Sequence, residues 1–316
     1  MRVLVEVASW NAADIIGIAL DAILRQTSPV EEIVIVDNAS TDGTSELTYP
    51  EIVTLVRNQL NLGIGGAVKT GMEYALTHGY DWLWVLDADS RPRPNTLELL
   101  IRLAEAGVPP EGRHQDIGVV GPSHNLLNLG RILRGRLLTP GGPRLTKLRQ
   151  DRDYIDCDSV IWSGALINLA AVRQVGLPRT GTLGCWEDFS LDYGDFEYTY
   201  RLRRAGYKIL VHRDGIIDHR IGRGLHGRIL GLNFYSTNHP AFRRYLYFRN
   251  LVFFWLKLYH RRNWPVLLVW FSYRLSVILA GIALLECERG PKLKACLSGI
   301  RDGLRGRLDG SFDASP

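Results

Sequence analysis

Two aspartates one residue apart follow an apolar run in the sequence. Asp87 and Asp89 come directly after Trp82 to Leu86, in the stretch WLWVLDADS. Because alternate residues of a strand point to the same face, these two carboxylates would lie side by side. Carboxylate oxygens are ligands that hard divalent cations prefer, and one of the pair could instead accept a ribose hydroxyl. An isolated pair more often only solvates a strand end, so the motif needs partners elsewhere in the chain.

A third aspartate ends another apolar run. Asp37 begins the stretch DNASTDGT, and its carboxylate could accept the N3–H of a uracil or thymine ring. The alternative is structural, because Asn38, Ser40 and Asp42 could form a polar turn that caps the next element. The stretch alone leaves both interpretations open.

A glycine-rich stretch, LGIGGAVKTG, is a candidate phosphate site. It resembles part of a dinucleotide fingerprint, but Val68 replaces the last glycine and the motif does not follow the first strand. A Rossmann-type NAD site is therefore not expected. Free backbone N–H groups at such a helix start suit a phosphate, and Lys69 could add charge toward a diphosphate. Simple loop flexibility is the alternative.

The stretch DYGDFEYTYR carries two further carboxylates, Asp192 and Asp195. They would share a helix face if one helix includes both. Their aromatic neighbours would desolvate a carboxylate and raise its pKa, which suits a general base. The alternative is an acidic helix N-terminus stabilised by the helix dipole. Later in the chain, His219 would complete a metal shell of oxygen and nitrogen ligands together with Asp87 and Asp89.

Alternating strands and helices are expected to position these side chains. Strands are predicted at VLVEVASWN, EEIVIVDNAS, EIVTLVRN and DWLWVLDADS, and helices at 14–25, 65–78 and 95–106. Strands this apolar, alternating with helices, predict an α/β fold with a mostly parallel sheet covered by helices on both faces. Ligands of such sheets bind at the carboxyl ends of the strands, where Asn11, Asp37, Asn58 and Asp87 lie. Residues 107–152 are rich in Gly, Pro and Arg and are predicted to be loops.

The composition indicates a globular protein of one large core or two domains, since 46% of its 316 residues are hydrophobic and 22% charged. The four cysteines show no CxxC spacing, so reduced thiols are expected and neither a disulfide framework nor a zinc site. No cleavable signal peptide is expected, because the chain enters a strand directly at Val3 without a basic region before it. These features favour a cytoplasmic protein.

The C-terminal part is basic and rich in aromatic residues. No Asp or Glu occurs from His219 to Leu285, while ten Lys or Arg do. Such a segment could bind nucleic acid, a membrane surface or an anionic substrate. Its run Trp264–Leu285 has 22 residues and one charge, Arg274, so it is long enough to span a bilayer, but the central charge argues against spanning. Amphipathic helices in the membrane interface are predicted, and a helical subdomain packing on itself or on a second copy is the alternative.

Taken in order, SWN, DNASTDGT, RNQLNLGIGGAVKTG, DADS, SGALI, WEDFSLDYGDFEYTYRLRRAGYKI and DHR resemble the inverting family 2 glycosyltransferases of GT-A fold. Within that family the chain is most similar to bacterial rhamnosyltransferases and galactofuranosyltransferases, over roughly residues 1–255. The resemblance implies a GT-A (Rossmann-like) domain at 1–238, followed by a basic, aromatic-rich helical region at 239–316 that meets a membrane interface or another protomer.

The residues and the resemblance together predict a complete site. The donor-binding residues are Asn11, Asp37, Asn38, Arg57, Asn58, Lys69, Asp87 and Asp89. The ligands of Mg²⁺ or Mn²⁺ are Asp89, as the direct ligand, with Asp87 and His219. The catalytic base is Asp195, with Asp192 as the alternative. The acceptor side is Trp162, Gly164 and Trp186, and core packing is an equally open interpretation of both tryptophans.

The function implied is metal-dependent, inverting transfer of a sugar from dTDP-rhamnose or a UDP-sugar to a glycan or lipid-linked acceptor. The setting would be cell-surface polysaccharide synthesis at the inner face of the cell membrane. A galactofuranosyl or another hexosyl transferase is the first alternative, although galactofuranosyl enzymes typically carry paired aspartates where this chain has Gly194 and Asp195. The alternative of another class is a basic nucleic-acid- or membrane-binding protein without catalysis. No nucleic-acid partner is expected, and a homo-oligomer is possible.

Overall fold

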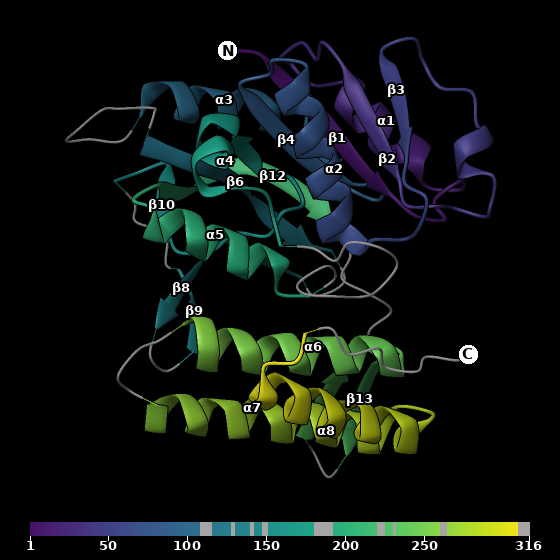
Figure 1. Ribbon diagram of the computed structural model, residues 1–316, viewed down its shortest axis with the longest axis vertical. Helices are drawn as coiled ribbons and strands as arrows, with labels where there is room; N and C mark the ends of the chain where they lie inside the picture. The colour runs from purple at the N-terminus through teal and green to yellow at the C-terminus, as the bar shows by residue number, and fades with distance from the viewer. Residues whose placement is uncertain are drawn as a thin grey trace.

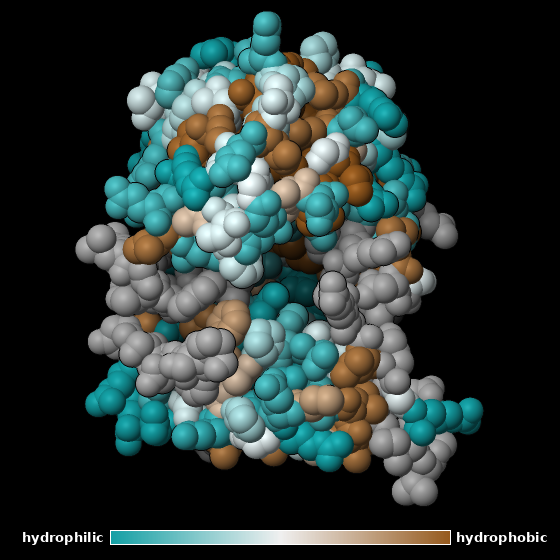
Figure 2. All heavy atoms as spheres, turned by 90° about the vertical axis from the view of Figure 1, so that its right-hand side faces the viewer, coloured by the Kyte–Doolittle hydropathy of each residue, from teal (hydrophilic) through white to brown (hydrophobic). Residues whose placement is uncertain are grey.

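The computed structural model describes residues 1–107, 116–127, 130–139, 142–146, 151–179, 192–219, 225–229, 232–259 and 264–308. An α/β part carries the N-terminal half of the chain, and a layer of helices from the C-terminal region lies beneath it (Figure 1). Figure 2 shows a hollow with hydrophilic walls between these two parts.

The α/β part is built on one large sheet in the order β10-β12-β6-β11-β4-β1-β2-β3. Its strands are β1 (Val3–Ser9), β2 (Ile33–Asp37), β3 (Val53–Arg57), β4 (Trp82–Asp87), β6 (Ile117–Leu126), β10 (Tyr154–Cys157), β11 (Leu166–Asn168) and β12 (Lys208–His219). The strands β4, β1, β2 and β3 are parallel, and so are β6 and β12, while β11 runs antiparallel between the two groups. The predicted mostly parallel α/β sheet is confirmed.

Helices cover both faces of this sheet (Figure 1). The helices α2 (Gly63–Thr77), α4 (Leu169–Val175) and α5 (Gly194–Arg204) pack on the face that carries Leu4 of β1. The opposite face, which carries Val5 and Val7, is covered by α1 (Ile16–Leu24) and α3 (Thr96–Ala106). Because neighbouring residues of a strand point to opposite faces, a strand with apolar residues at both odd and even positions, such as β1, contributes to two cores at once. The helices on both faces therefore agree with the sequence pattern.

The prediction of loops over 107–152 is wrong for much of that range. It contains β6, which is a ten-residue strand in the middle of the sheet, and the short strands β7 (Arg131–Leu133), β8 (Arg136–Thr139) and β9 (Gly142–Leu145). Glycines interrupt the apolar pattern of this strand in the sequence. In the structure these glycines allow neighbouring side chains to pack closely against the strand. A Cβ on Gly118 would lie 2.9 Å from Tyr207 Cβ, and one on Gly121 would lie 3.1 Å from Val160.

The C-terminal helices are α6 (Ala241–Phe253), continued by a π-helical turn at Phe254–Leu258, then α7 (Trp264–Leu285) and α8 (Arg289–Arg305). Helix α8 lies very close to α6, because a Cβ on Gly299 would be 2.3 Å from the Tyr245 carbonyl oxygen. A Cβ on Gly303 would be 2.6 Å from the carbonyl oxygen of Arg249. The predicted helical C-terminal segment is thus present, with two of its helices in direct backbone contact.

Helix α7 packs against two β-hairpins. A Cβ on Gly142 of β9 would be 2.5 Å from the Trp270 ring, and one on Gly227 would be 2.3 Å from Leu285 Cδ2. Gly227 belongs to the hairpin formed by β13 (Leu225–Ile229) and β14 (Leu232–Ser236). The helical layer therefore also contacts segments that precede residue 239, and the boundary between 1–238 and 239–316 stays a prediction.

Candidate active site

The carboxyl ends of the parallel strands gather polar side chains at one edge of the sheet. The register places Ser9 beside Asp37, Asp37 beside Arg57, and Ala8 beside Asp87. Asp37 and Asp87 thus flank the end of β1, and Arg57 lies one strand further, next to Asp37. This edge is where open α/β sheets bind ligands.

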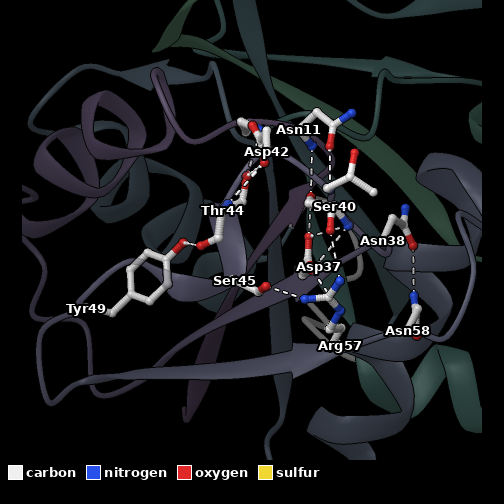
Figure 3. Close-up of polar contacts among 12 residues, drawn as sticks. Asn11, Asp37, Asn38, Ser40, Asp42, Thr44, Ser45, Tyr49, Arg57 and Asn58 are labelled. Atoms are coloured by element: carbon white, nitrogen blue, oxygen red, sulfur yellow. Dashed lines mark hydrogen bonds and ion pairs between the residues drawn. The ribbon is translucent and has the colours of Figure 1, made fainter.

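Asp37 is buried and held by two neighbours (Figure 3). Its carboxylate accepts a hydrogen bond from the Ser40 hydroxyl and lies 3.6 Å from Arg57 Nε. Arg57 also donates from Nη2 to the Ser40 carbonyl at 2.8 Å and from Nη1 to the Ser45 hydroxyl. The buried charge of Asp37 is therefore compensated by an arginine whose own position is fixed by the same turn.

Asn38 and Asn58 connect this edge to the start of α2. Asn38 Nδ2 donates to the carbonyl oxygen of Gly63 at 2.9 Å, and Asn58 Nδ2 donates to Asn38 Oδ1 at 2.8 Å. Helix α2 begins at Gly63, two residues before the predicted start, with a φ of 68° that favours glycine. Lys69 lies half-buried on α2 and has no ion-pair partner within the described residues.

Asn11 ties the loop after β1 to the loop after β2. Its N–H donates to Ser40 Oγ at 2.8 Å, and its Oδ1 accepts from the Thr41 N–H at 2.8 Å (Figure 3). Nearby, Asp42 accepts hydrogen bonds from the N–H groups of Ala13 and Thr44, both at 3.0 Å. The DNASTDGT stretch therefore does form a polar turn. From the sequence, Ser40 was assigned to that turn and to nothing else. In the structure the Ser40 hydroxyl contacts both Asp37 and Asn11, which lie in different loops.

Asp87 and Asp89 do not share the face of a strand, so that prediction is wrong. Strand β4 ends at Asp87, because the Ser90 side chain accepts the Asp87 N–H at 3.0 Å and the Ser90 N–H returns to the Asp87 carbonyl at 2.9 Å. These bonds close a turn in which Asp87 is half-buried and Asp89 is exposed. The Ser90 hydroxyl is in turn 2.8 Å from that of Ser163. The two carboxylates project from a fixed turn instead of a flat strand.

The pairing of β5 (Arg91–Pro92) with β12 brings His219 toward this turn. Arg91, two residues after Asp89, lies opposite Asp218, and His219 is the next and last residue of β12. The main chain of His219 therefore runs beside the turn, while its side chain lies outside the described residues. Among the described side chains, no three His, Cys, Asp or Glu lie together as a metal site. The two carboxylates are nonetheless oxygen donors of the kind that Mg²⁺ and Mn²⁺ prefer.

Glu6, which the sequence analysis did not single out, is a buried carboxyl in the central strand. Its side chain is 0% exposed, and neither carboxylate oxygen has a hydrogen-bond partner among the described residues. Burial, and secondly the charge of Asp87, raise the pKa of Glu6 well above its ordinary value. Helix α2 covers it closely, since a Cβ on Gly71 would lie 2.6 Å from Glu6 Cγ. A glutamate inside an otherwise apolar strand was the signal available in the sequence.

Asp195 lies in the first turn of α5 and is the more isolated of the two candidate bases. Burial raises the pKa of Asp195 to about 6, against the lowering effect of the Arg136 charge. Its Oδ1 accepts the Phe196 N–H at 2.9 Å. Helix α5 begins at Gly194, after Tyr193, which has a φ of 70°. A carboxylate with a raised pKa at a helix start is suited to accepting a proton near neutral pH.

Asp192 lies outside the helix, so the two carboxylates do not share a helix face as predicted. Its Oδ2 is 3.4 Å from Arg243 Nε, on α6. Burial raises the pKa of Asp192, while the Arg243 charge acts in the opposite direction. From the sequence, Asp195 was predicted as the base and Asp192 as the alternative, and the structure adds an arginine from the C-terminal region that pairs with Asp192.

The residues predicted for the acceptor side lie mostly in the core. Trp162 is 4% exposed and packs with Tyr198, at a ring-centroid distance of 6.4 Å. Gly164 has a φ of 82°, and a Cβ there would be 2.1 Å from Ile217 Cδ1. Trp186 lies outside the described residues. Core packing, left open for Trp162 by the sequence, accounts for its position.

Residues 5–126 match the protein-family model described as Glycosyl transferase family 2. The galactofuranosyltransferase GlfT1 of Mycolicibacterium smegmatis is 28% identical over 180 residues, which are 54% of this chain and 58% of that protein. The undecaprenyl-phosphate mannosyltransferase of Micrococcus luteus is 35% identical over 112 residues, 34% of this chain and 44% of that protein. The match thus spans little more than half of the first of these relatives and less than half of the second.

Two solved structures share the fold. The mannosyltransferase PcManGT from Pyrobaculum calidifontis, in complex with GDP-Man and Mn²⁺, superposes with a TM-score of 0.52 at 19% identity, covering 99% of this chain and 77% of its own. S. aureus TarS 1–349 in complex with UDP gives a TM-score of 0.54 at 13% identity, covering 98% and 82%. At these identities the likeness concerns the fold.

Proposed function

Because the chain carries a family 2 glycosyltransferase domain on a GT-A fold, we propose that it is a metal-dependent, inverting sugar transferase. It would move a sugar from a nucleotide donor to a glycan or lipid-linked acceptor. One observation carries the proposal: Asp37, Arg57 and Asp87 end β2, β3 and β4 at the same edge of the sheet, and Asn38, next to Asp37, contacts the start of α2. That edge offers groups for a base, a diphosphate and a cation within one surface.

The donor would lie along this edge. Asp37 and Asn38 would bind the nucleotide base, with Arg57 and Asn58 holding their orientation through the bonds described above. Lys69 would approach the diphosphate from α2. Asp87 and Asp89 would hold Mg²⁺ or Mn²⁺, with His219 as a third ligand, and a bound cation would neutralise charge on the leaving diphosphate. The neighbour PcManGT was solved with Mn²⁺, which supports a cation at this place.

Asp195 is the proposed base. It would take the proton of an acceptor hydroxyl, which then attacks the sugar from the face opposite the diphosphate and inverts the anomeric configuration. Its pKa of about 6 leaves it ionised, but more basic than an ordinary aspartate, at pH 7. Asp192 is the weaker candidate, because the Arg243 guanidinium lies against its carboxylate. The acceptor side would include the neighbourhood of Trp162, Gly164 and Trp186.

The leading donors are dTDP-rhamnose and a UDP-sugar. A galactofuranosyl donor is the second candidate, and the similarity to the galactofuranosyltransferase GlfT1 favours it. The single aspartate at Gly194-Asp195, where such enzymes typically have a pair, counts against it. Another hexosyl donor is supported by the similarity to an undecaprenyl-phosphate mannosyltransferase.

A membrane surface is the proposed location, at the inner face of the cell membrane. Within the described residues, one helix is long and apolar enough to cross a membrane, Leu267–Leu285, and 17% of it is buried. Its one charge, Arg274, turns inward to donate to the Tyr247 hydroxyl at 3.2 Å. The exposed residues of α7 are therefore uncharged, and α8 exposes Leu297 between Lys294 and Arg301. Exposed uncharged helix surfaces next to basic side chains favour contact with an anionic lipid surface. A second copy of the chain is the alternative partner for these surfaces.

The nucleic-acid alternative has less support in the structure than in the sequence. Arg244 and Arg249 are buried, and Arg243 and Arg274 are engaged by Asp192 and Tyr247. Much of the basic segment therefore adds no positive charge to the surface, and nucleic-acid binding depends on such surface charge.

The test is a panel of UDP-, dTDP- and GDP-linked sugars with Mg²⁺ or Mn²⁺. Thermal shift measures binding, and release of the nucleoside diphosphate, with water as acceptor, measures turnover. We expect one nucleotide class to raise the melting temperature in a cation-dependent manner and to be turned over. If no nucleotide stabilises the protein at millimolar concentration, the proposal is wrong.

A further inference from the structure

Helix α6 of the C-terminal region holds the loop that carries the candidate base. The loop Asp192–Asp195, called the base loop below, receives two contacts from α6. Asn250 Nδ2 donates to the main-chain oxygen of Asp192 at 2.7 Å, and Arg243 Nε lies 3.4 Å from the side chain of the same residue. The main chain and the side chain of Asp192 are thus both fixed by one helix more than fifty residues later.

Asp192 precedes a residue whose backbone conformation is unfavourable for a side chain other than glycine. Tyr193 has a φ of 70°, in the left-handed region that residues other than glycine seldom adopt. Such conformations persist only where the surroundings enforce them. The Tyr193 ring is enclosed by Phe196, Tyr247 and Phe254, at centroid distances of 4.9, 5.8 and 5.9 Å. The turn in the main chain directs α5 and therefore determines where Asp195 points.

Asn250 is itself held in one orientation. It is 0% exposed, and its Oδ1 accepts a hydrogen bond from Arg249 Nε at 3.0 Å, so its Nδ2 faces Asp192. Arg249 is also buried and donates from Nη1 to the carbonyl oxygen of Leu308, beyond the end of α8, at 2.6 Å. A continuous polar chain therefore runs from the segment after α8, through Arg249 and Asn250, to the base loop.

We propose that Asn250 is a positioning residue for catalysis: its amide holds the Asp192 carbonyl and thereby the left-handed turn that aims Asp195 at the acceptor. This inference rests on the proposed function, because it assigns a role toward the proposed base. It gives the C-terminal helices a part in the reaction that neither the family match over residues 5–126 nor the sequence motifs include.

The test variant is Asn250→Asp. It keeps the size of the side chain and an acceptor for Arg249, but it places an oxygen against the Asp192 carbonyl instead of a donor. The probe is the nucleotide sugar of the UDP-, dTDP- and GDP-linked panel that wild type turns over fastest with Mn²⁺. We expect kcat to fall about 10- to 100-fold with donor KM little changed, since a small misplacement of a catalytic group costs rate and not donor binding. In Asn250→Ala, which adds no charge, the acid limb of the pH–rate profile should also move below the wild-type midpoint near pH 6, because a loosened Asp195 is better solvated.

The matched control is Ser236→Ala. It removes another buried hydrogen bond of α6, from Arg244 Nη2 to the Ser236 hydroxyl at 3.0 Å, which does not involve the base loop. This variant should lower the melting temperature and leave kcat and the pH profile unchanged. If Asn250→Asp does not fold, Asn250→Ala removes the amide without adding charge and gives the same comparison.

A folded Asn250 variant with wild-type kcat and pH profile would overturn the inference. So would an equal loss of kcat in Ser236→Ala, because the effect would then be a general loss of packing. The failure of the proposed function would look different: wild type itself would show no nucleotide-dependent thermal shift and no turnover. Nucleotide binding retained in every variant thus separates the two outcomes.

Discussion

Replacement of Glu6 should change how the stability of this protein depends on pH. Glu6 is 0% exposed on the central strand β1, and neither carboxylate oxygen has a hydrogen-bond partner among the described residues. Burial, with a smaller contribution from Asp87, raises the pKa of this carboxyl well above its ordinary value. At pH values between the ordinary and the raised pKa, the folded protein keeps Glu6 protonated and unfolding releases that proton.

The sign and size of the effect follow from proton linkage. Between the ordinary glutamate value, near 4.5, and the raised pKa, the native state binds one proton more than the unfolded state. The stabilisation is fully present below the ordinary value and is lost as pH rises toward the raised pKa. The loss is about 1.4 kcal/mol for each pH unit, or about 2.7 kcal/mol from pH 5 to pH 7 while Glu6 stays protonated.

The variant to compare with wild type is Glu6→Met. A methionine is unbranched, so it fits beneath α2, where a Cβ on Gly71 would already lie 2.6 Å from Glu6 Cγ. Urea unfolding would be measured from pH 5 to pH 8 with EDTA present. The difference in unfolding free energy between the two proteins isolates Glu6 from other titrating groups. We expect Glu6→Met to gain on wild type by about 1.4 kcal/mol per pH unit from pH 5 up to the raised pKa of Glu6, and the pH at which the gain levels off reports that pKa.

Glu32→Gln is the matched control. Hydrogen bonds from Tyr74, Tyr80 and Thr54 outweigh partial burial and lower the pKa of Glu32. Its contribution to stability is therefore lost only as pH falls below the ordinary glutamate value, and its difference from wild type should be flat from pH 5 to pH 8. A flat difference for Glu6→Met over the same range would refute the reasoning, since Glu6 would then be ionised in the folded protein.

Three further predictions follow from the site and the helical layer. Asp195→Asn should abolish turnover of the nucleotide sugar while keeping the nucleotide-dependent thermal shift, and wild-type turnover should fall as pH drops through about 6. An active Asp195→Asn with an inactive Asp192→Asn would show that the wrong carboxylate was chosen. Gly303→Val should lower the melting temperature by several degrees, because a Cβ there meets the Arg249 carbonyl at 2.6 Å and overpacking costs about 1–3 kcal/mol; an unchanged melting temperature would contradict the close contact of α6 and α8. Leu297→Glu, on a side chain 62% exposed, should weaken co-sedimentation with anionic phosphatidylglycerol vesicles at least several-fold, whereas Leu24→Glu on the distant α1 should not; equal binding by both variants would argue against lipid contact through α8.

Local sequence patterns predicted the sheet better than the site. Apolar strands followed by helices predicted parallel strands with both faces covered, and that pattern requires no information about distant contacts. The same logic placed Asp37, Arg57 and Asp87 at strand ends. It failed for Asp87 and Asp89 as a strand pair, because a single serine, Ser90, closes the turn after Asp87 through hydrogen bonds. It failed for β6 because its glycines serve contacts with Tyr207 and Val160, far along the chain.

The sequence could not predict which carboxylates are buried and which are paired with an arginine. The residue types alone offered both Asp192 and Asp195 as bases, with the resemblance favouring Asp195, and the ion pair of Asp192 with Arg243 of α6 became visible only in the structure. The arginines of the basic segment likewise looked like surface charge, yet Arg244 pairs with the buried Glu286, and Arg249 lies inside. Burial and pairing depend on which elements meet, and those elements are separated by tens of residues.

The sequence by itself therefore determined the α/β architecture, the resemblance to family 2 glycosyltransferases and the edge of the sheet where chemistry is expected. These depend on the period of apolar residues and on the direction of parallel strands, which are local properties. Only the tertiary structure decided that Glu6 is a buried acid and that α6 holds the base loop through Asn250. The physical reason is that desolvation and hydrogen bonding act through space, so a carboxyl acquires its pKa and its direction from neighbours that the chain supplies from elsewhere.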